Sequence, residues 1–243
     1  MLKQLTDAEH GTVLVTDCQT AGRGQRGNSW EAAPGLNLTF SILLRPAALP
    51  PLRQFEVSCV VALAVARMLD RALAASPHTP EVFVKWPNDI YVGDKKICGI
   101  LIENVITGSR IDSCVAGIGL NINQLNFLSD APNPVSLRQL TGREYRLDNL
   151  LSSLSSLILD LFDKHVQKFN AEHPDAEYNS ALIQQYKQRL WRRNGYHPYI
   201  DNIDNKQFIG EIVDVEPTGH IIIRHADTSI HRYAFKEITP LNH

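Results

Sequence analysis

The sequence lacks the cysteine clusters and the charge excess that mark several common classes of protein. Its four cysteines form no CxxC or other close pair, and each lies in an apolar segment, which predicts reduced, buried thiols rather than disulfides or zinc ligands. The 24 Lys and Arg residues nearly balance the 26 Asp and Glu residues, giving a net charge of −2. This balance provides no general attraction to nucleic acid, so no nucleic-acid partner is expected.

Long hydrophobic runs and familiar catalytic patterns are also missing. The first eleven residues are polar, and the most apolar run, Val57–Met68, is too short to span a membrane. We therefore expect a soluble, cytoplasmic protein without a membrane partner. The sequence contains no GxxxxGK[ST] phosphate loop and no evident Ser–His–Asp pattern. His220, His225 and His231 are expected at the surface, and no protein-bound metal is predicted.

The pattern of apolar residues predicts an α/β (α+β) fold in two parts. Residues 11–17 and 36–46 are typical of strands, residues 55–75 of a helix, and residues 82–123 of several short strands with a tight turn at Gly93–Asp94. Helical patterns follow at 147–169 and 178–193, and the chain after Gly195 is rich in β-type residues. We expect a catalytic domain over residues 1–193 and a small β domain over residues 194–243.

The stretch GRGQRG, residues 22–27, has the letters of a dinucleotide-binding fingerprint but not its setting. The preceding strand ends near Asp17, Pro34 and Gly35 prevent a helix of useful length, and Ile42 stands where an acidic residue is expected. What remains is a glycine-rich loop whose backbone N–H groups and two arginines, Arg23 and Arg26, suit phosphate oxygens. A solvated surface turn remains the alternative from the loop alone.

Two further motifs carry polar groups at strand ends. KWPND, residues 85–89, lies between apolar strands, and its proline starts a turn that would display Lys85, Asn88 and Asp89 together; a common turn is the simpler interpretation. Lys96 follows the hairpin turn and shares a face with Gly99 if one bulge intervenes.

In GIGLNIN, residues 117–123, strand alternation places Gly117, Gly119, Asn121 and Asn123 on one face. Glycines there let another body approach the backbone, and the amide of Asn121 matches an adenine edge. Strand packing would explain the glycines, but it would not explain the asparagines.

These three motifs, in this order and spacing, closely resemble the catalytic domain of the biotin protein ligases. The resemblance implies a catalytic fold related to class II aminoacyl-tRNA synthetases and a small SH3-like β-barrel at the C-terminus. It implies that biotin and Mg·ATP give biotinyl-5′-AMP, from which biotin passes to a lysine of a biotin carboxyl carrier domain.

The resemblance also implies roles for individual residues. The catalytic residues would be Lys96, Arg23 and Asp89, with Asp89 orienting the acceptor lysine or accepting its proton. Biotin would contact Gln19, Gly22, Arg23, Gly24, Lys96, Gly99, Gly117 and Gly119. ATP would contact Arg23, Gln25, Arg26, Trp30, Lys96 and Asn121.

The chain departs from the family pattern in two places. No Ser-Thr-Asn segment precedes the first strand, which suggests a truncated or divergent ligase, and no winged helix-turn-helix is expected, hence no operator binding. Gln25 stands where many relatives have arginine, which predicts faster escape of biotinyl-AMP than in a Gln25→Arg variant. A lipoate or octanoate transferase and a non-catalytic binding module remain alternatives. A monomer and a homodimer are both compatible with the sequence.

Overall fold

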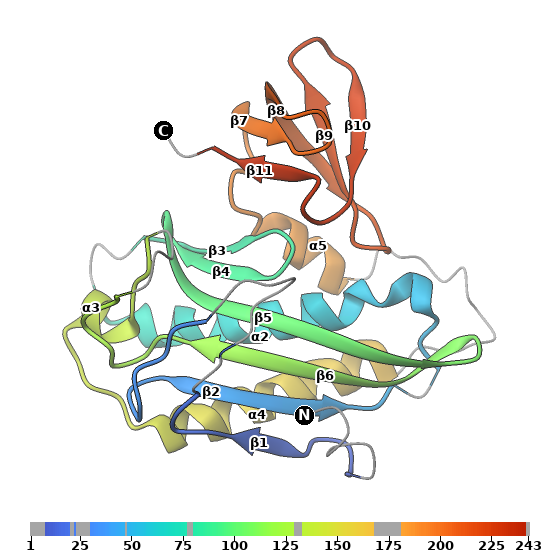
Figure 1. Ribbon diagram of the computed structural model, residues 1–243. Coiled ribbons are helices and arrows are strands. Elements are labelled where there is room, and N and C mark those ends of the chain that lie inside the picture. The colour runs from blue at the N-terminus through green and yellow to red at the C-terminus, as the bar shows by residue number, and fades with distance from the viewer. Residues whose placement is uncertain are drawn as a thin grey trace.

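Two antiparallel β-sheets organise the chain in the computed structural model (Figure 1). The structure describes residues 8–19, 22, 30–46, 48–76, 80–128, 133–167 and 181–241. The larger sheet has six strands in the order β1-β2-β6-β5-β4-β3. Its strands are β1 (Val13–Val15), β2 (Leu38–Leu44), β3 (Val82–Lys85), β4 (Asp89–Val92), β5 (Lys95–Thr107) and β6 (Arg110–Leu120).

Helices cover one face of this sheet and leave the other face for the site. Helix α2 (Phe55–Leu73) packs on β3, β4 and β5, and α4 (Leu147–Phe162) packs on α2 and β2. The run from Val57 to Ala66 is almost entirely buried because both the sheet and α4 contact the helix. The helix predicted over 55–75 is therefore confirmed, and it lies at the centre of the core.

The opposite face of the sheet carries small and polar side chains. The register pairs Thr39 of β2 with Gly119 of β6, and Gly119 in turn with Gly99 of β5. Two residues further along the strands, Ser41 pairs with Gly117. Directly paired residues point to the same face, so these positions form a shallow floor across three strands.

Strand β6 ends at Leu120, three residues before the end of the GIGLNIN motif. The expectation that Asn121 and Asn123 continue the glycine face is therefore wrong. Instead, Asn121 Nδ2 donates to the Val135 carbonyl, and Asn123 exchanges hydrogen bonds with the backbone of Tyr145.

The second sheet lies C-terminal to the first and has the strand order β10-β9-β8-β7-β11. Its strands are β7 (His197–Asp201), β8 (Lys206–Val215), β9 (Ile221–His225), β10 (Ile230–Tyr233) and β11 (Ile238–Pro240). The expected small C-terminal β domain is confirmed as an antiparallel sheet, with buried Tyr199, Ile223 and Tyr233 in its core. In Figure 1 this sheet stands above the β3–β4 edge of the larger one.

Helix α5 (Ala181–Gln188) precedes the C-terminal sheet and ends at Gln188, before the end of the pattern predicted over 178–193. The residues after Gln188 pair with β3 instead: Val84 N–H donates to the Arg189 carbonyl, and Trp191 N–H donates to the Val84 carbonyl. Short helical segments at Pro51–Arg53, α3 (Leu137–Thr141) and Asp163–Gln167 complete the elements. Across the described ranges, no helix has the length and apolar character needed to cross a membrane.

Candidate active site

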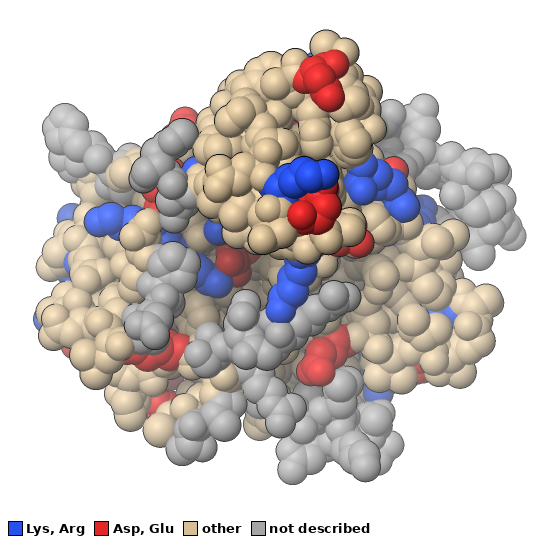
Figure 2. Space-filling model, turned by 45° about the horizontal axis from the view of Figure 1, so that its top comes forward, with Lys and Arg blue, Asp and Glu red and all other residues tan. Residues whose placement is uncertain are grey.

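A cavity of about 770 Å³ lies between the open face of the larger sheet and the C-terminal sheet. Its walls come from β2, β5 and β6, from the KWPND motif, and from residues of the C-terminal sheet such as Tyr199, Phe235 and Lys236. Figure 2 shows the surface hollowed beneath the C-terminal sheet, with acidic and basic side chains at the hollow. This volume is within the usual range for a small-molecule site.

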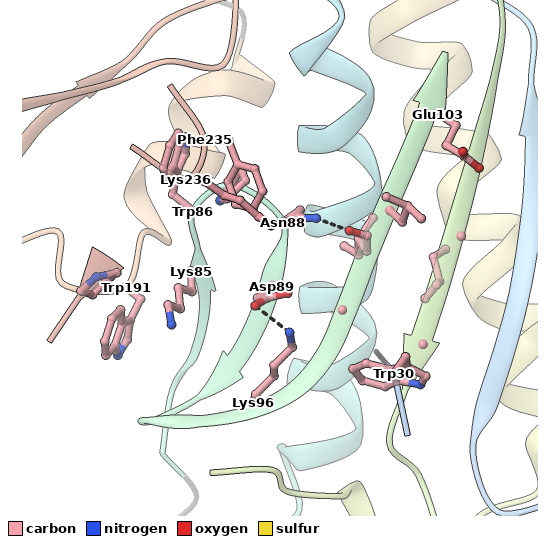
Figure 3. A pocket seen from close by; sticks show the side chains of 18 of the residues that line it. Trp30, Lys85, Trp86, Asn88, Asp89, Lys96, Glu103, Trp191, Phe235 and Lys236 are labelled. Carbon is pink, nitrogen blue, oxygen red and sulfur yellow. Dashed lines mark hydrogen bonds and ion pairs between the residues drawn. The ribbon is translucent and has the colours of Figure 1, made fainter. Parts of the chain in front are cut away.

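Lys96 and Asp89 form an ion pair inside this cavity. Lys96 Nζ lies 2.7 Å from Asp89 Oδ2, and both side chains are about three-quarters buried (Figure 3). A bulge between β4 and β5 pairs Asp89 with Gly99 and Tyr91 with Lys96, so Lys96 and Gly99 share a face as predicted. Two of the three residues predicted to be catalytic, Lys96 and Asp89, therefore lie together at one edge of the glycine floor.

The glycine floor is covered by Trp30 in this structure (Figure 3). A Cβ atom built on Gly119 would lie 2.3 Å from the Trp30 indole, and one on Gly99 would lie 3.1 Å from it. The Trp30 Nε1 atom is buried and has no hydrogen-bond partner among the described residues, and Lys96 Nζ lies 5.8 Å from the ring centre. The close approach predicted at these glycines is confirmed, but the approaching group here is a side chain of the chain itself.

Gln19 and Gly22 stand at the same end of the cavity. Gln19 lines it, and the Gly22 carbonyl accepts a hydrogen bond from Trp30 N–H at 3.2 Å. A Cβ on Gly22 would lie 2.3 Å from the Trp30 carbonyl oxygen, so this position requires glycine. The roles predicted for four residues of the loop stay predictions, because these residues lie outside the described ranges: Arg23, Gly24, Gln25 and Arg26.

Asn121 does not line the cavity. The residue is 3% exposed, and its Nδ2 donates to the Val135 carbonyl at 3.1 Å, while Oδ1 is buried and has no partner within the described ranges. Asn123 exchanges two hydrogen bonds with the backbone of Tyr145, which gives it a structural role. The adenine contact predicted for Asn121 stays a prediction, and the free acceptor Oδ1 is compatible with it.

Several residues that line the cavity were not assigned to the site from the sequence. Asn88, next to Asp89, is buried and donates from Nδ2 to the Ile100 carbonyl, and its place in KWPND was the available signal. Lys85, from the same motif, also lines the cavity. Tyr199, Phe235 and Lys236 reach it from the C-terminal sheet, and no sequence pattern connected them to it.

Carboxylates are sparse in the cavity, where Asp89 and Glu103 are the acidic residues of the wall. In the part of the chain that the structure describes, no group of three or more His, Cys, Asp and Glu side chains is placed to hold a metal ion. A divalent cation here would depend on oxygens brought by a ligand, as Mg²⁺ commonly does at phosphate sites.

An α+β catalytic fold followed by a small C-terminal antiparallel β-sheet is also the fold of solved biotin protein ligases. The structure titled "Biotin protein ligase from Aquifex aeolicus in complex with biotin and ATP" superposes with a TM-score of 0.74 at 22% identity, covering 99% of this chain and 94% of that one. Residues 2–121 match the model of the Biotin/lipoate A/B protein ligase family. The matched segment contains helix α2 and the six strands of the larger sheet.

Curated relatives resemble a part of the chain. The Biotin--[acetyl-CoA-carboxylase] ligase of Paracoccus denitrificans is 33% identical over 147 residues, which are 56% of this chain and 57% of that protein. The Bifunctional ligase/repressor BirA of Bacillus spizizenii is 34% identical over 143 residues, 57% of this chain and 42% of that protein. The chain thus spans about half the length of these relatives.

Proposed function

We propose that the chain is an ATP-dependent biotin–protein ligase. It activates biotin to biotinyl-5′-AMP and transfers the biotinyl group to a lysine of a biotin carboxyl carrier domain. The observation that carries the proposal is the Lys96–Asp89 pair at 2.7 Å beside a floor made by Gly99 and Gly119. A strand face without side chains gives room for the body of a substrate, and the neighbouring cation suits its carboxylate.

In the first step, a carboxylate oxygen of biotin attacks the α-phosphorus of ATP. The bond from this phosphorus to the bridging oxygen breaks, and pyrophosphate leaves with the electron pair. Negative charge accumulates on the phosphoryl oxygens, and the ammonium of Lys96 is held by Asp89 at the place where it can neutralise that charge. A cation fixed before the reaction lowers the barrier because it needs no reorganisation.

In the second step, the amine of the acceptor lysine attacks the carbonyl carbon of the mixed anhydride and displaces AMP. We assign to Asp89 the orientation of this amine and the uptake of its proton. Because Asp89 is paired with Lys96, this role requires Lys96 to bind the reacting carboxylate or phosphate first. The two residues would therefore act in sequence.

Mg²⁺ would enter with the phosphates of ATP, whose oxygens would bind it. We further assign residues 1–193 to the catalytic domain and 194–243 to the β domain, and we assign the protein to the cytoplasm as a monomer or homodimer. The carrier domain is the proposed macromolecular partner.

The test is transfer of label from biotin to a carrier domain in the presence of ATP. We expect Lys96→Ala to lower the rate of biotinyl-AMP formation by about 10²–10³-fold, whereas Lys95→Ala, an exposed neighbour in the same hairpin, keeps the wild-type rate. Transfer of lipoate in place of biotin would support the related transferase. Binding of biotin without transfer by the wild-type chain would refute the ligase activity.

A further inference from the structure

Trp191 contacts the β4–β5 hairpin that carries Lys96, although it has no part in the proposed chemistry. It lies beside Lys85 in the wall of the cavity, and only 7% of the residue is exposed (Figure 3). Its backbone N–H donates to the Val84 carbonyl, which fixes the residue beside β3. A buried tryptophan usually has a hydrogen-bond acceptor for its indole N–H, so the partner of that group shows what the side chain holds.

The indole N–H holds the turn between β4 and β5. Trp191 Nε1 donates to Asp94 Oδ1 at 2.9 Å, and Asp94 lies two residues before Lys96. A hydrogen bond to a carboxylate is stronger than one between neutral groups. The start of β5, where Lys96 lies, is therefore attached to Trp191 through the turn.

The indole ring also packs against the residue opposite Lys96. Its centre lies 5.5 Å from the ring centre of Tyr91. Tyr91 is buried and pairs directly with Lys96 across β4 and β5, at the bulge in this ladder. Paired residues of neighbouring strands share a face and contact each other. Trp191 thus meets the hairpin twice, at its turn and at the partner of Lys96.

The other supports of Lys96 hold its backbone from the side away from β4. Lys96 N–H donates to the Asn133 carbonyl, and the Lys96 carbonyl accepts from Val135 N–H. The ammonium of Lys96, however, reaches Asp89 on β4. The place of this ammonium therefore depends on how β4 and the turn are held, and these are the two parts that Trp191 contacts.

The backbone next to Trp191 is strained in a way that favours this contact. Arg192 has a φ of +59°, a left-handed conformation that costs energy for a residue with a side chain. Its guanidinium lies 4.1 Å from the Trp191 ring centre and donates to the carbonyls of Pro198 and Leu241. A cation over an indole face is attracted to it, so Arg192 holds the ring against the hairpin.

We propose that Trp191 is a positioning residue for Lys96. Through Asp94 and Tyr91 it fixes the hairpin so that the Lys96 ammonium meets Asp89 at 2.7 Å. This inference rests on the proposed role of Lys96 in forming biotinyl-AMP. A displacement of about 1 Å at a reacting group can lower a rate by about 10²-fold. Loss of the contact should therefore lower kcat and leave substrate affinity unchanged.

The test is the rate of biotinyl-AMP formation by the full chain and three variants. Trp191→Phe keeps a ring and removes the N–H, Asp94→Ala removes the acceptor, and Asp94→Asn keeps an acceptor oxygen. We expect Trp191→Phe and Asp94→Ala to lower kcat by about 5- to 50-fold, with the KM for biotin and for ATP changed less than about twofold. Asp94→Asn should stay within about threefold of the wild-type kcat.

Two further variants separate positioning from general stability. Asp70→Ala removes the ion pair by which Arg189 attaches the same segment to α2, so it should lower stability in urea and keep the wild-type rate. The double variant Trp191→Phe/Asp94→Ala should be no slower than the slower single variant, because both changes remove one hydrogen bond.

Three results would overturn the positioning role. They are an unchanged kcat in both Trp191→Phe and Asp94→Ala, a raised KM at unchanged kcat, and equal losses in Asp94→Asn and Asp94→Ala. The second would make Trp191 a substrate contact, and the third would assign the effect to charge. If Trp191→Phe does not fold, Asp94→Ala decides the question, because the Asp94 side chain is exposed.

Acetylation of lysine amines by acetic anhydride tests the inference without the ligase activity. The Lys96 amine is paired and about three-quarters buried, so it should react slowly relative to Lys206, whose side chain is 78% exposed. Trp191→Phe and Asp94→Ala should raise this relative rate at least about threefold, because they loosen the hairpin locally. Asp70→Ala and Asp94→Asn should leave it unchanged.

The two measurements distinguish failure of this inference from failure of the ligase activity. If the wild type forms biotinyl-AMP while Trp191→Phe and Asp94→Ala keep its rate and its acetylation pattern, the ligase stands and the positioning role falls. If acetylation of Lys96 depends on Trp191 and Asp94 but the wild type forms no biotinyl-AMP, the positioning role stands and the ligase falls.

Discussion

At the scale of single residues, the position of the Trp30 side chain depends on the absence of a side chain at Gly119. The indole lies where the side chain of any other residue at 119 would begin, and its Nε1 atom has no hydrogen-bond partner in the part of the chain that the structure describes. The ring therefore gains packing against the strand but loses a hydrogen bond that water would supply. A ligand that enters over the glycines must compete with this ring or accept a hydrogen bond from it.

A double-mutant cycle tests this dependence. Gly119→Ala should lower the free energy of unfolding by about 1–3 kcal/mol in the wild type, since the added methyl overpacks against the indole. In a Trp30→Ala background the same substitution should cost less than about 0.5 kcal/mol. Urea denaturation of the four proteins measures the coupling.

Gly117→Ala provides the control for this cycle. The nearest atom to a Cβ at Gly117 is 3.6 Å away, an ordinary contact distance. That substitution should change stability by less than about 0.5 kcal/mol whether or not Trp30 is present. Equal costs for both glycines would show that Trp30 does not lie on the floor in solution.

The sequence predicted that Lys96 and the glycines lie together, but it did not predict that Trp30 covers the glycine floor. The bulge that brings Lys96 and Gly99 to one face follows from a count of strand positions, and the structure has it. The side chains of Asn121 and Asn123 leave the glycine face and bond to the backbone of Val135 and Tyr145. Such contacts between distant segments leave no mark in local alternation.

At the scale of elements, the long helix and the strands were predictable because their apolar periods are strong. Helix α3 was not anticipated, although its sequence carries a signal. Ser136 accepts from the Gln139 N–H, and the Gln139 side chain accepts from the Ser136 N–H, which is a capping box. The S-x-x-Q spacing at 136–139 would have indicated a helix start.

The first turn of helix α2 contains a buried carboxyl group, that of Glu56. Glu56 is 1% exposed, and burial raises the pKa of its carboxyl while Arg53, its hydrogen-bond partner, opposes that change. A raised pKa means that the folded state binds the proton more tightly than the unfolded state. The contribution of Glu56 to stability is thus fully present below its unfolded pKa and is lost as the pH rises through the folded pKa.

We therefore expect a pH-dependent difference between the wild type and Glu56→Gln. As the pH is lowered from 8 toward 5, the wild type should gain stability relative to the variant, since its carboxyl becomes neutral in place. Urea unfolding of both proteins at several pH values gives the difference directly. A difference that shrinks on acidification would contradict the assignment of burial as the dominant effect.

At the scale of the whole molecule, the two sheets meet through a few specific contacts. The Trp86 indole donates to the Gly219 carbonyl at 2.9 Å and packs edge-on against Phe235, and Lys187 pairs with Asp214. Trp86 belongs to KWPND, so the C-terminal sheet contacts the motif that carries Asp89. The presence of two parts was predictable from the change in composition near Gly195. The contacts of Trp86 were not, because they join residues more than a hundred positions apart.

Gly219 is the residue where this junction is most restricted. Its φ of +88° suits glycine, and a Cβ there would lie 2.9 Å from the ring of Phe55 at the start of α2. Gly195 has a similar φ of +81°, and a Cβ there would meet nothing within 4 Å. The two glycines therefore separate the cost of the backbone conformation from the cost of the clash.

Gly195→Ala should lower the free energy of unfolding by about 1 kcal/mol, the cost of a left-handed conformation for alanine. Gly219→Ala should cost about 1–3 kcal/mol more, because its methyl also displaces Phe55. The displacement would lengthen the hydrogen bond from Trp86, so the indole proton of Trp86 should exchange with solvent faster in Gly219→Ala alone, as NMR can follow. If both variants lose the same stability and protect that proton equally, the β8–β9 turn does not hold the KWPND motif, and the C-terminal sheet reaches the cavity without fixing its wall.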